Sequence, residues 1–301
     1  MEAPRRGSRA TGVVLVLVAA VLWSSGGLGI KSTPLPPLAL AGYRGLFALP
    51  VLVGMVAVRG RHAGQLPWRR VAASPWAWAA AASYSVMVIA FVAATKLTTA
   101  ANAIFIQYTS PVYVAVLSWP LLRERVTWRD GVACAGVLAG MLLFFAGDLS
   151  ASARAGNIVA IVSSFGAAGL PLCLRADQRR HASDARVALV APSLAIAAGD
   201  VLAVLVCTPS MLASPPPDAR AWALVVGLGL VQIGVPYVLY GAAMQRLSAL
   251  EGSLLPTIEP ILNPVWVALA TGETPGHMAL LGGACVLSSI VFQACVSRRR
   301  E

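Results

Sequence analysis

A carboxylate, Glu259, lies in the middle of a long apolar stretch of this 301-residue chain, between Pro256 and Pro260. Proline removes a backbone hydrogen-bond donor and tends to kink a helix, so the backbone beside Glu259 should be bent. Ionisable groups inside such stretches cost free energy and are candidates for function by default. We therefore predict that Glu259 binds a solute, exchanges a proton or acts as a gate. The alternative is a neutral carboxylic acid that bonds to a neighbouring helix for packing.

Three other ionisable residues, Arg44, Asp200 and Glu251, also lie within apolar stretches. At about 1.5 Å per helical residue, Arg44 should lie about 10 Å from the N-terminal end of its helix and Asp200 about 10 Å from the C-terminal end of its own. Both of these ends are expected on the outer side, so the two charges should lie at similar depth. An ion pair between them would lower the cost of burying both charges. The alternative for Arg44 is to extend its guanidinium to the nearer aqueous interface. Glu251 is close to the end of its stretch, so we expect it to be solvated.

Polar and aromatic side chains that could line a solute pocket are spread through the same stretches. The candidates are Trp23, Ser24, Tyr84, Asn102, Gln107, Tyr108, Ser163, Gln232 and Tyr237. An amide in an apolar helix must find a partner, either on another helix or on a ligand. Aromatic residues near helix ends are more often anchors at a membrane interface. Together with Glu259, these candidates form the predicted substrate site.

The sequence gives little support to catalysis or to a metal centre. The histidines His62, His181 and His277 lie in loops or at helix ends, and no HExxH or GxSxG motif is present. The five cysteines form no CxxC pair and have no histidine at metal-ligand spacing. The chain also lacks the GxxxxGK[ST] motif of an ATP-binding loop. We predict no enzyme activity, no cofactor and no bound metal.

The composition is that of a membrane protein. Hydrophobic residues make up 58% of the chain and charged residues 12%, whereas a soluble domain is about half apolar and a quarter charged. Ten apolar stretches are long enough to span a bilayer, where a continuous span must be helical. They lie near residues 11–30, 37–58, 75–94, 99–119, 129–147, 155–174, 187–207, 220–242, 250–270 and 276–296. We expect an all-α integral membrane protein with ten transmembrane helices.

The basic residues indicate how these helices are oriented. With the N-terminus inside, the inner loops and tails carry 18 basic residues and the outer loops carry 4. This bias predicts that both termini are cytoplasmic and that the protein lies in an inner or plasma membrane. The net charge of +11 is spread over short loops, so nucleic-acid binding is not expected. Arginine outnumbers lysine 21 to 2, which is typical of a GC-rich genome. We expect a bacterial source.

The second half of the chain repeats the first. The segment from Leu97 to Glu124 is similar to that from Leu247 to Glu273, at an offset of 149 or 150 residues. Five helices per half would make the second half enter the membrane from the opposite side, which gives an inverted-topology repeat. The predicted units are a cytoplasmic tail (1–10), two repeats (11–147 and 155–296) and a basic cytoplasmic tail (297–301). Glu124 and Glu273 are expected to cap a helix or to pair with a loop arginine.

Short motifs spread over both halves are typical of one family of membrane proteins. They are VLWSSG at 21–26 with Lys31, Tyr43-Arg44, ATKLTTA at 94–100, LLRERVT at 121–127, Gly156-Asn157, Glu259-Pro260 and Gly272-Glu273. On these motifs the chain resembles the EamA-like family of the drug/metabolite transporter superfamily over nearly its whole length. It departs from the family pattern at Arg123, where Gly is usual, at Pro275-Gly276, where Leu-Thr is frequent, and at Phe165, where Trp is common.

The resemblance implies a carrier that moves amino acids or similar small neutral or zwitterionic metabolites by alternating access, without ATP. It also implies a central cavity, with Phe165 facing the transport path. We expect export, with proton coupling through Glu259 as one option. Export of drugs or other metabolites, import and exchange are alternatives within the superfamily, and a non-transporting membrane scaffold or sensor is the alternative outside it. The expected partners are a small-molecule substrate and the lipid bilayer, with the protein as a monomer or homodimer.

Overall fold

The computed structural model describes residues 6–63, 68–144, 153–262 and 277–298, and every regular element among them is helical. The first half contains α1 (Arg6–Trp23), α2 (Gly26–Ser32), α3 (Pro37–His62), α4 (Trp68–Ala72), α5 (Pro75–Leu97), α6 (Ala100–Gln107), α7 (Ser110–Leu122) and α8 (Trp128–Phe144). The second half contains α9 (Arg154–Arg180), α10 (Ala185–Ala213), α11 (Ala219–Gly227), the π-helix η1 (Leu228–Gly234), α12 (Val235–Ala243), α13 (Ala249–Leu254), the 3₁₀ helix η2 (Leu255–Ile258) and α15 (His277–Arg298).

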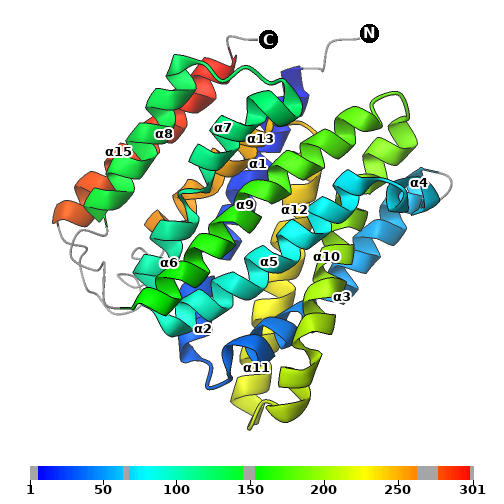
Figure 1. The fold of residues 1–301 in the computed structure, drawn as a ribbon, viewed down its shortest axis with the longest axis vertical. Coiled ribbons are helices and arrows are strands. Elements are labelled where there is room, and N and C mark those ends of the chain that lie inside the picture. The colour runs from blue at the N-terminus through cyan, green and yellow to red at the C-terminus, as the bar shows by residue number, and fades with distance from the viewer. Residues whose placement is uncertain (1–5, 64–67, 145–152, 263–276, 299–301) are drawn as a thin grey trace.

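Six helical segments in the described part of the chain are long and apolar enough to cross a membrane. They are Arg9–Ser32, Pro37–His62, Pro75–Leu97, Arg154–Arg180, Ala185–Ala213 and Ala219–Ala243. Large apolar side chains such as Val116, Leu205 and Leu212 face outward from the bundle. An apolar surface of this extent suits lipid rather than water. The chain is therefore a multi-pass membrane protein, and Figure 1 shows its long helices packed into one bundle.

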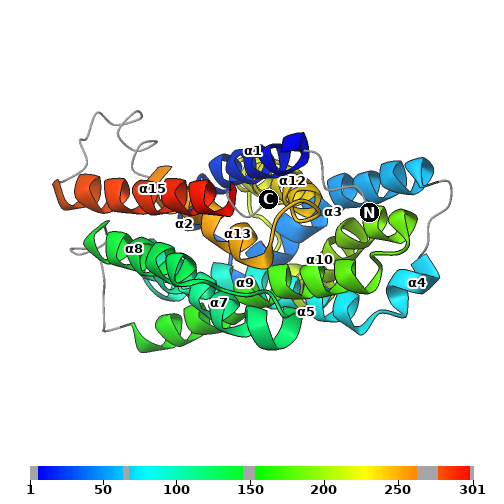
Figure 2. The same cartoon turned by 90° about the horizontal axis from the view of Figure 1, so that it is seen from above.

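The helices pack in pairs that relate one half of the chain to the other. α3 packs on α10, and α8 packs on α15. Figure 1 shows the α8–α15 pair at one edge of the bundle. α5 packs along α9 just as α1 packs along α12. Seen from above, α1 and α12 lie on one side of the bundle and α5 and α9 on the other (Figure 2). The α3–α10 and α8–α15 pairs each join a helix to its counterpart in the other half, and the α5–α9 pair corresponds to the α1–α12 pair. This is the pattern of an internal repeat.

One contact joins two residues that are equivalent in the two halves. The Cys285 thiol donates to the carbonyl oxygen of Gly136 at 3.4 Å, and these residues are 149 positions apart. A residue meets its own repeat equivalent only near the axis that relates the repeats. The α8–α15 contact therefore lies close to that axis.

The repeated segments begin at matching helix caps. The Thr99 hydroxyl accepts a hydrogen bond from the backbone N–H of Asn102 at the start of α6. The Ser248 hydroxyl accepts one from the backbone N–H of Glu251 at the start of α13. These caps are 149 residues apart, so the offset of 150 suggested by the sequence is wrong at this point. A capping hydroxyl satisfies an otherwise unpaired helix N–H, and this requirement sets the register of the repeats.

Arg123 has a backbone conformation that favours glycine. It ends α7 with φ 52° and ψ 27°, in the left-handed region. A side chain there costs free energy because its Cβ crowds the following carbonyl group. This requirement explains why glycine is usual at this position in the family that the chain resembles.

Candidate substrate cavity

A cavity of about 90 Å³ lies where four irregular helical segments meet. The irregular segments are the break between α1 and α2, the break between α6 and α7, the π-helix η1 and the 3₁₀ helix η2. A single water needs roughly 10–15 Å³ of such space, so the cavity has room for a small organic solute. Irregular backbone is tolerated at membrane depth where it is buried in protein or lines a cavity.

Two serine side chains account for the first break. The hydroxyl of Ser24 donates to the carbonyl oxygen of Val21 at 2.6 Å, and the hydroxyl of Ser25 donates to that of Leu22 at 2.9 Å. Serine hydroxyls that bond to nearby backbone compete with the regular helical ladder. The chain therefore leaves α1 at Trp23 and resumes as α2 at Gly26.

Proline accounts for the breaks in the repeated segments. Pro111 lies near the start of α7 and Pro256 lies within η2, and neither can donate a backbone hydrogen bond. The bend predicted beside Glu259 is present as the 3₁₀ helix η2, which ends just before that residue. The break at Tyr108–Thr109 lies inside the stretch 99–119, which was predicted to be one continuous helix. The prediction of a continuous helix over this stretch is therefore wrong.

The cavity wall combines an apolar part, an aromatic part and a polar part. The apolar residues are Met87, Val88, Phe91, Ala167, Leu170 and Ile233. The aromatic residues are Trp23, Tyr108, Tyr237 and Tyr240, and the polar and charged residues are Arg44, Gln107, Ser110, Gln232, Ser253 and Glu259. Sequence reasoning missed Ser110 and Ser253 as site residues. The available signal was their closeness to a proline: Ser110 directly precedes Pro111, and Ser253 lies three residues before Pro256.

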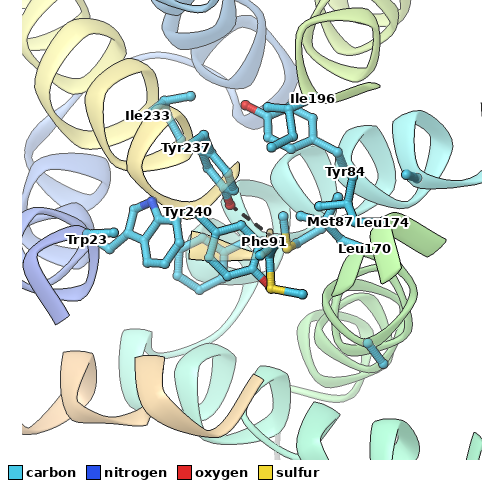
Figure 3. Packing of buried hydrophobic residues seen from close by; sticks show 14 of the residues in the cluster. Trp23, Tyr84, Met87, Phe91, Leu170, Leu174, Ile196, Ile233, Tyr237 and Tyr240 are labelled. Carbon is cyan, nitrogen blue, oxygen red and sulfur yellow. Dashed lines mark hydrogen bonds between the residues drawn. The ribbon is translucent and has the colours of Figure 1, made fainter. Parts of the chain in front are cut away.

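The aromatic wall is a packed cluster (Figure 3). The ring of Trp23 lies 4.9 Å from that of Tyr237 and 5.6 Å from that of Tyr240, measured between centroids. Tyr84 meets Tyr237 edge-on at 4.7 Å. The Tyr237 hydroxyl points to the sulfur of Met87 at 3.9 Å, the contact drawn as a dashed line in Figure 3. The mutual packing of these rings fixes the shape of this side of the cavity.

Glu259 forms its hydrogen bond across the cavity. Its Oε2 atom accepts from the Tyr108 hydroxyl at 2.5 Å. Tyr108 is at the break between α6 and α7, and Glu259 follows η2. The carboxylate therefore links the irregular points of the two repeats and faces the space in which a solute would lie.

Arg44 is buried, with only 3% of its surface exposed, so it does not extend to an aqueous interface. Its guanidinium donates to Oε1 of Gln232, and the Gln232 amide lies 3.4 Å from the carbonyl oxygen of Trp23. Asp200 instead accepts from the Tyr84 hydroxyl at 3.1 Å. The predicted Arg44–Asp200 ion pair is thus replaced by two separate hydrogen bonds, because each group has a nearer neutral partner. Arg44 and Asp200 do share a second, water-sized cavity of about 10 Å³.

Four of the predicted site residues do not line the cavity. Tyr84 packs against Tyr237 and bonds to Asp200, and the other three form helix contacts beside the cavity. The Ser24 hydroxyl bonds within its own helix. The Asn102 amide donates to Oδ1 of Asn157 at 3.0 Å, and this bond joins the starts of α6 and α9. The Ser163 hydroxyl accepts from the Gln107 amide at 2.9 Å and donates to the carbonyl oxygen of Met87. Ser163 therefore positions the cavity-lining Gln107, whereas Asn102 joins two helix ends.

Glu251 is buried rather than solvated, which corrects the sequence-based expectation. It pairs with Arg9 at 2.5 Å, and their side chains are only 8% and 12% exposed. It also completes a capping box with Ser248 at the start of α13. The two roles hold the carboxylate inside the protein, although it lies near the end of its apolar stretch.

Of the two roles expected for Glu124, a helix cap or an ion pair with an arginine, the structure shows the ion pair. Its Oε1 atom lies 2.8 Å from Arg175 and 3.0 Å from Arg179, both in the last turns of α9 rather than in a loop. Glu273, the equivalent residue in the second repeat, lies outside the described residues.

Phe165 faces away from the cavity, contrary to the expectation. Its side chain is 57% exposed, and its ring stacks on Tyr113 with centroids 4.8 Å apart. Ala167, two residues later, lines the cavity instead. Residues two apart on a helix lie about 200° apart around its axis, so Phe165 must face away from the cavity when Ala167 faces it.

Among the described residues, no group of three or more His, Cys, Asp or Glu side chains could hold a metal ion. The site thus consists of one cationic, one acidic and several amide, hydroxyl and aromatic side chains around a small cavity. Such a set can bind a small polar solute and can exchange a proton through a carboxyl group.

Comparisons with known proteins agree with this architecture. The sequence model of the EamA-like transporter family matches the chain twice, over residues 10–146 and 154–294. A protein of Archaeoglobus fulgidus described as an uncharacterized transporter is 29% identical over 205 residues, which cover 68% of this chain and 71% of that protein. A solved structure described only as a crystal structure of protein superposes with a TM-score of 0.73 at 20% identity, covering 98% of this chain and 100% of its own. At that identity the likeness concerns the fold alone.

Proposed function

This chain belongs to the EamA-like transporter family, and from that premise we propose that it is a secondary active transporter of a bacterial cell membrane. It exports amino acids or similar small neutral or zwitterionic metabolites by alternating access. The observation that supports this most is the cavity at the meeting point of irregular helices from both repeats. In carriers built from repeats, substrate sites lie near the membrane midplane at discontinuous helices of this kind.

The proposed architecture has ten transmembrane helices in two five-helix repeats of inverted topology, with both termini cytoplasmic. The repeats are 11–147 and 155–296, and short tails at 1–10 and 297–301 flank them. The paired packing of α3 with α10 and of α8 with α15 supports this arrangement, because each helix meets its counterpart from the other half. The bias of basic residues toward one side supports the orientation. The chain acts as a monomer or homodimer surrounded by lipid.

The composition of the cavity wall supports a solute with both polar and apolar parts. Amides and hydroxyls provide hydrogen bonds, and the Trp23–Tyr237–Tyr240 cluster provides a large apolar face. Glu259 is the proposed proton-coupling or gating residue, because it faces the cavity and has a hydrogen-bond partner on the other repeat. A carboxyl group that gains and loses a proton there would alter that bond during the transport cycle.

The test is labelled-solute counterflow in proteoliposomes preloaded with a mixed pool of amino acids and metabolites. Two substitutions on the same helix form a matched pair: Ala167→Trp fills the cavity, and Phe165→Trp changes only the outward face. We expect the wild type and Phe165→Trp to exchange solute and Ala167→Trp to lose exchange. Exchange that survives in a folded Ala167→Trp protein would contradict the proposed path. Absence of flux with any solute would favour a scaffold or sensor.

A further inference from the structure

Arg44 is a buried cation whose hydrogen-bonding capacity is only partly used. It lies on α3, lines the main cavity and donates to Gln232. Within the described ranges, its Nε and Nη1 atoms have no hydrogen-bond partner. A guanidinium carries five N–H donors, and buried donors without acceptors cost free energy. This side chain is therefore prepared for an acceptor that the described residues do not provide.

The guanidinium is held in place from the opposite half of the chain. Gln232 belongs to the π-helix η1, a local irregularity of a kind that is frequent at functional sites. Gly229, in the same π-helix, lets η1 approach α3 closely, because a Cβ atom there would lie 2.6 Å from the Arg44 carbonyl oxygen. The backbone and the side chain of Arg44 are thus both fixed by η1. A group fixed in this way loses little conformational freedom when it binds a ligand.

The neighbouring carboxylates do not satisfy Arg44. Asp200 uses Oδ1 to accept from Tyr84, and the structure gives its Oδ2 atom no hydrogen bond within the described ranges. The space shared by Arg44 and Asp200 is about 10 Å³, enough for roughly one water. One water can accept two hydrogen bonds, whereas the Nε and Nη1 atoms of Arg44 carry three N–H donors. Glu259 lines the same main cavity but has Tyr108 as its hydrogen-bond donor. At least one Arg44 donor remains for a solute in the main cavity.

We propose that Arg44 is the residue that binds the carboxylate group of the solute, an inference that rests on the proposed transport function. A guanidinium donates a charge-assisted hydrogen bond to a carboxylate, and along one edge it can donate two parallel bonds, which ammonium groups cannot do. For Arg44 such an edge consists of Nε or Nη1 together with the second N–H of Nη2, whose other N–H is used by Gln232. Met87, Leu170 and Ile233 then offer an apolar wall to the rest of the molecule. The solute class is a small carboxylate with an apolar side chain, and Arg44 determines that specificity.

The test compares three probes that share one apolar side chain: L-leucine, 4-methylpentanoate and leucinamide. The first two carry a carboxylate, and leucinamide has a neutral amide in its place. Each is added to the purified full-length protein, and the shift in unfolding temperature is measured against concentration. We expect both carboxylates to stabilise the wild type and leucinamide to have little effect, because only a ligand that binds the folded state raises its stability.

Substitutions on α3 separate a binding role from a merely structural one. Arg44→Met should weaken carboxylate binding by about tenfold to a hundredfold, and Arg44→Lys by less, because a charge-assisted hydrogen bond is lost. Arg59→Met is the matched control. Arg59 is also buried on α3, but it donates to the Ser193 hydroxyl at 2.5 Å and does not line the main cavity. We expect carboxylate binding to persist in that variant.

A second substitution keeps the proposal testable if Arg44→Met does not fold. Gln232→Glu places a carboxylate beside the intact guanidinium, where it competes with the solute. We expect this variant to fold, to retain or increase its unfolding temperature and to bind both carboxylate probes more weakly.

Three results would overturn the assignment of Arg44: equal stabilisation by leucinamide, undiminished carboxylate binding in Arg44→Met or in Gln232→Glu, or no stabilisation by any carboxylate probe. Counterflow of labelled L-leucine distinguishes this failure from failure of the proposed function. Carboxylate binding through Arg44 without exchange would sustain the assignment and reject transport. Exchange that is equally fast in the wild type and in Arg44→Met would sustain transport and reject the assignment.

Discussion

The Tyr108 hydroxyl donates a hydrogen bond to Glu259 and lies 2.5 Å from its Oε2 atom. The donor is at the break between α6 and α7, and the acceptor directly follows η2. These breaks fall in the corresponding segments of the two repeats, so one bond joins both irregular points across the cavity. If one repeat moves against the other during transport, this bond must break and form again. The pair is therefore a candidate link between the state of the carboxyl group and the conformation of the carrier.

Tyr108→Phe tests this link because it removes the donor and keeps the ring in the cavity wall. The initial rate of labelled-solute counterflow should fall about tenfold, since a hydrogen bond to a charged group is worth about 1.5–3 kcal/mol. Tyr113→Phe is the control, because the Tyr113 ring stacks on the outward-facing Phe165. Equal rates in Tyr108→Phe and in the wild type would show that the bond plays no part in transport.

Close packing of α9 on α5 depends on Gly166. A Cβ atom there would lie 2.7 Å from the backbone nitrogen of Met87 and from the backbone oxygen of Ser83, and neither backbone can move aside cheaply. We expect Gly166→Ala to lower the free energy of unfolding by about 1–3 kcal/mol. At Gly54, within α3, a Cβ atom would meet nothing within 4 Å. Gly54→Ala should therefore be neutral or stabilising by up to about 1 kcal/mol.

Thermal unfolding of the two alanine variants in the same detergent measures this difference. A Gly166→Ala protein as stable as Gly54→Ala would contradict the close approach of α9 to α5.

The buried pair of Arg9 and Glu251 should contribute measurably to stability. It ties the start of α1 to the start of α13, and both side chains are at most 12% exposed. Glu251→Gln keeps an oxygen for the capping box but removes the charge, so we expect a loss of about 1–3 kcal/mol. A double-mutant cycle with Arg9→Gln gives the coupling energy of the pair.

The exposed ion pair of Arg70 and Asp184 is the control, and its coupling energy is measured in the same way. Its arginine side chain is 69% exposed, so its coupling should be smaller and should disappear as salt is added. A coupling between Arg9 and Glu251 that also disappears in salt would mean that this pair is solvated.

The proposed orientation can be tested with single cysteines in two loops, in a protein whose native cysteines have been replaced. The substitutions are Ala182→Cys, in the loop between α9 and α10, and Pro215→Cys, in the loop between α10 and α11. Both residues are exposed. A membrane-impermeant thiol reagent added to intact cells should label residue 215 and leave residue 182 unlabelled. Labelling of residue 182 from outside would reverse the orientation.

Much of the fold could be predicted from the sequence because lipid leaves the backbone few choices. The apolar stretch 155–174 corresponds to α9, which extends further, to Arg180. The bend at Glu259 follows from Pro256 and Pro260. The break after Trp23 was not predictable, because it depends on whether serine hydroxyls turn back to their own helix. The sequence gives no sign of the π-helix η1, which depends on packing against α3.

The candidate site was only partly predictable because side-chain partners lie far apart in the sequence. Trp23, Gln107, Gln232 and Tyr237 line the cavity. Asn102, an equally plausible amide, turns to Asn157 instead. Depth in the membrane pairs Arg44 with Asp200, but the side chain that accepts a hydrogen bond from Arg44 is Gln232. The depth of a residue in the membrane follows from its position along the helix. The direction in which its side chain points, and the residue that it contacts, depend on how the helices pack.

The decisive measurement is counterflow of labelled solute into proteoliposomes that contain the wild type or Glu259→Gln, with and without an imposed pH gradient. We expect the wild type to accumulate one class of solute in response to the gradient and Glu259→Gln to lose that response, because an amide cannot exchange a proton. Exchange that ignores the gradient and survives in Glu259→Gln would contradict proton coupling at this cavity and would leave Glu259 a structural role.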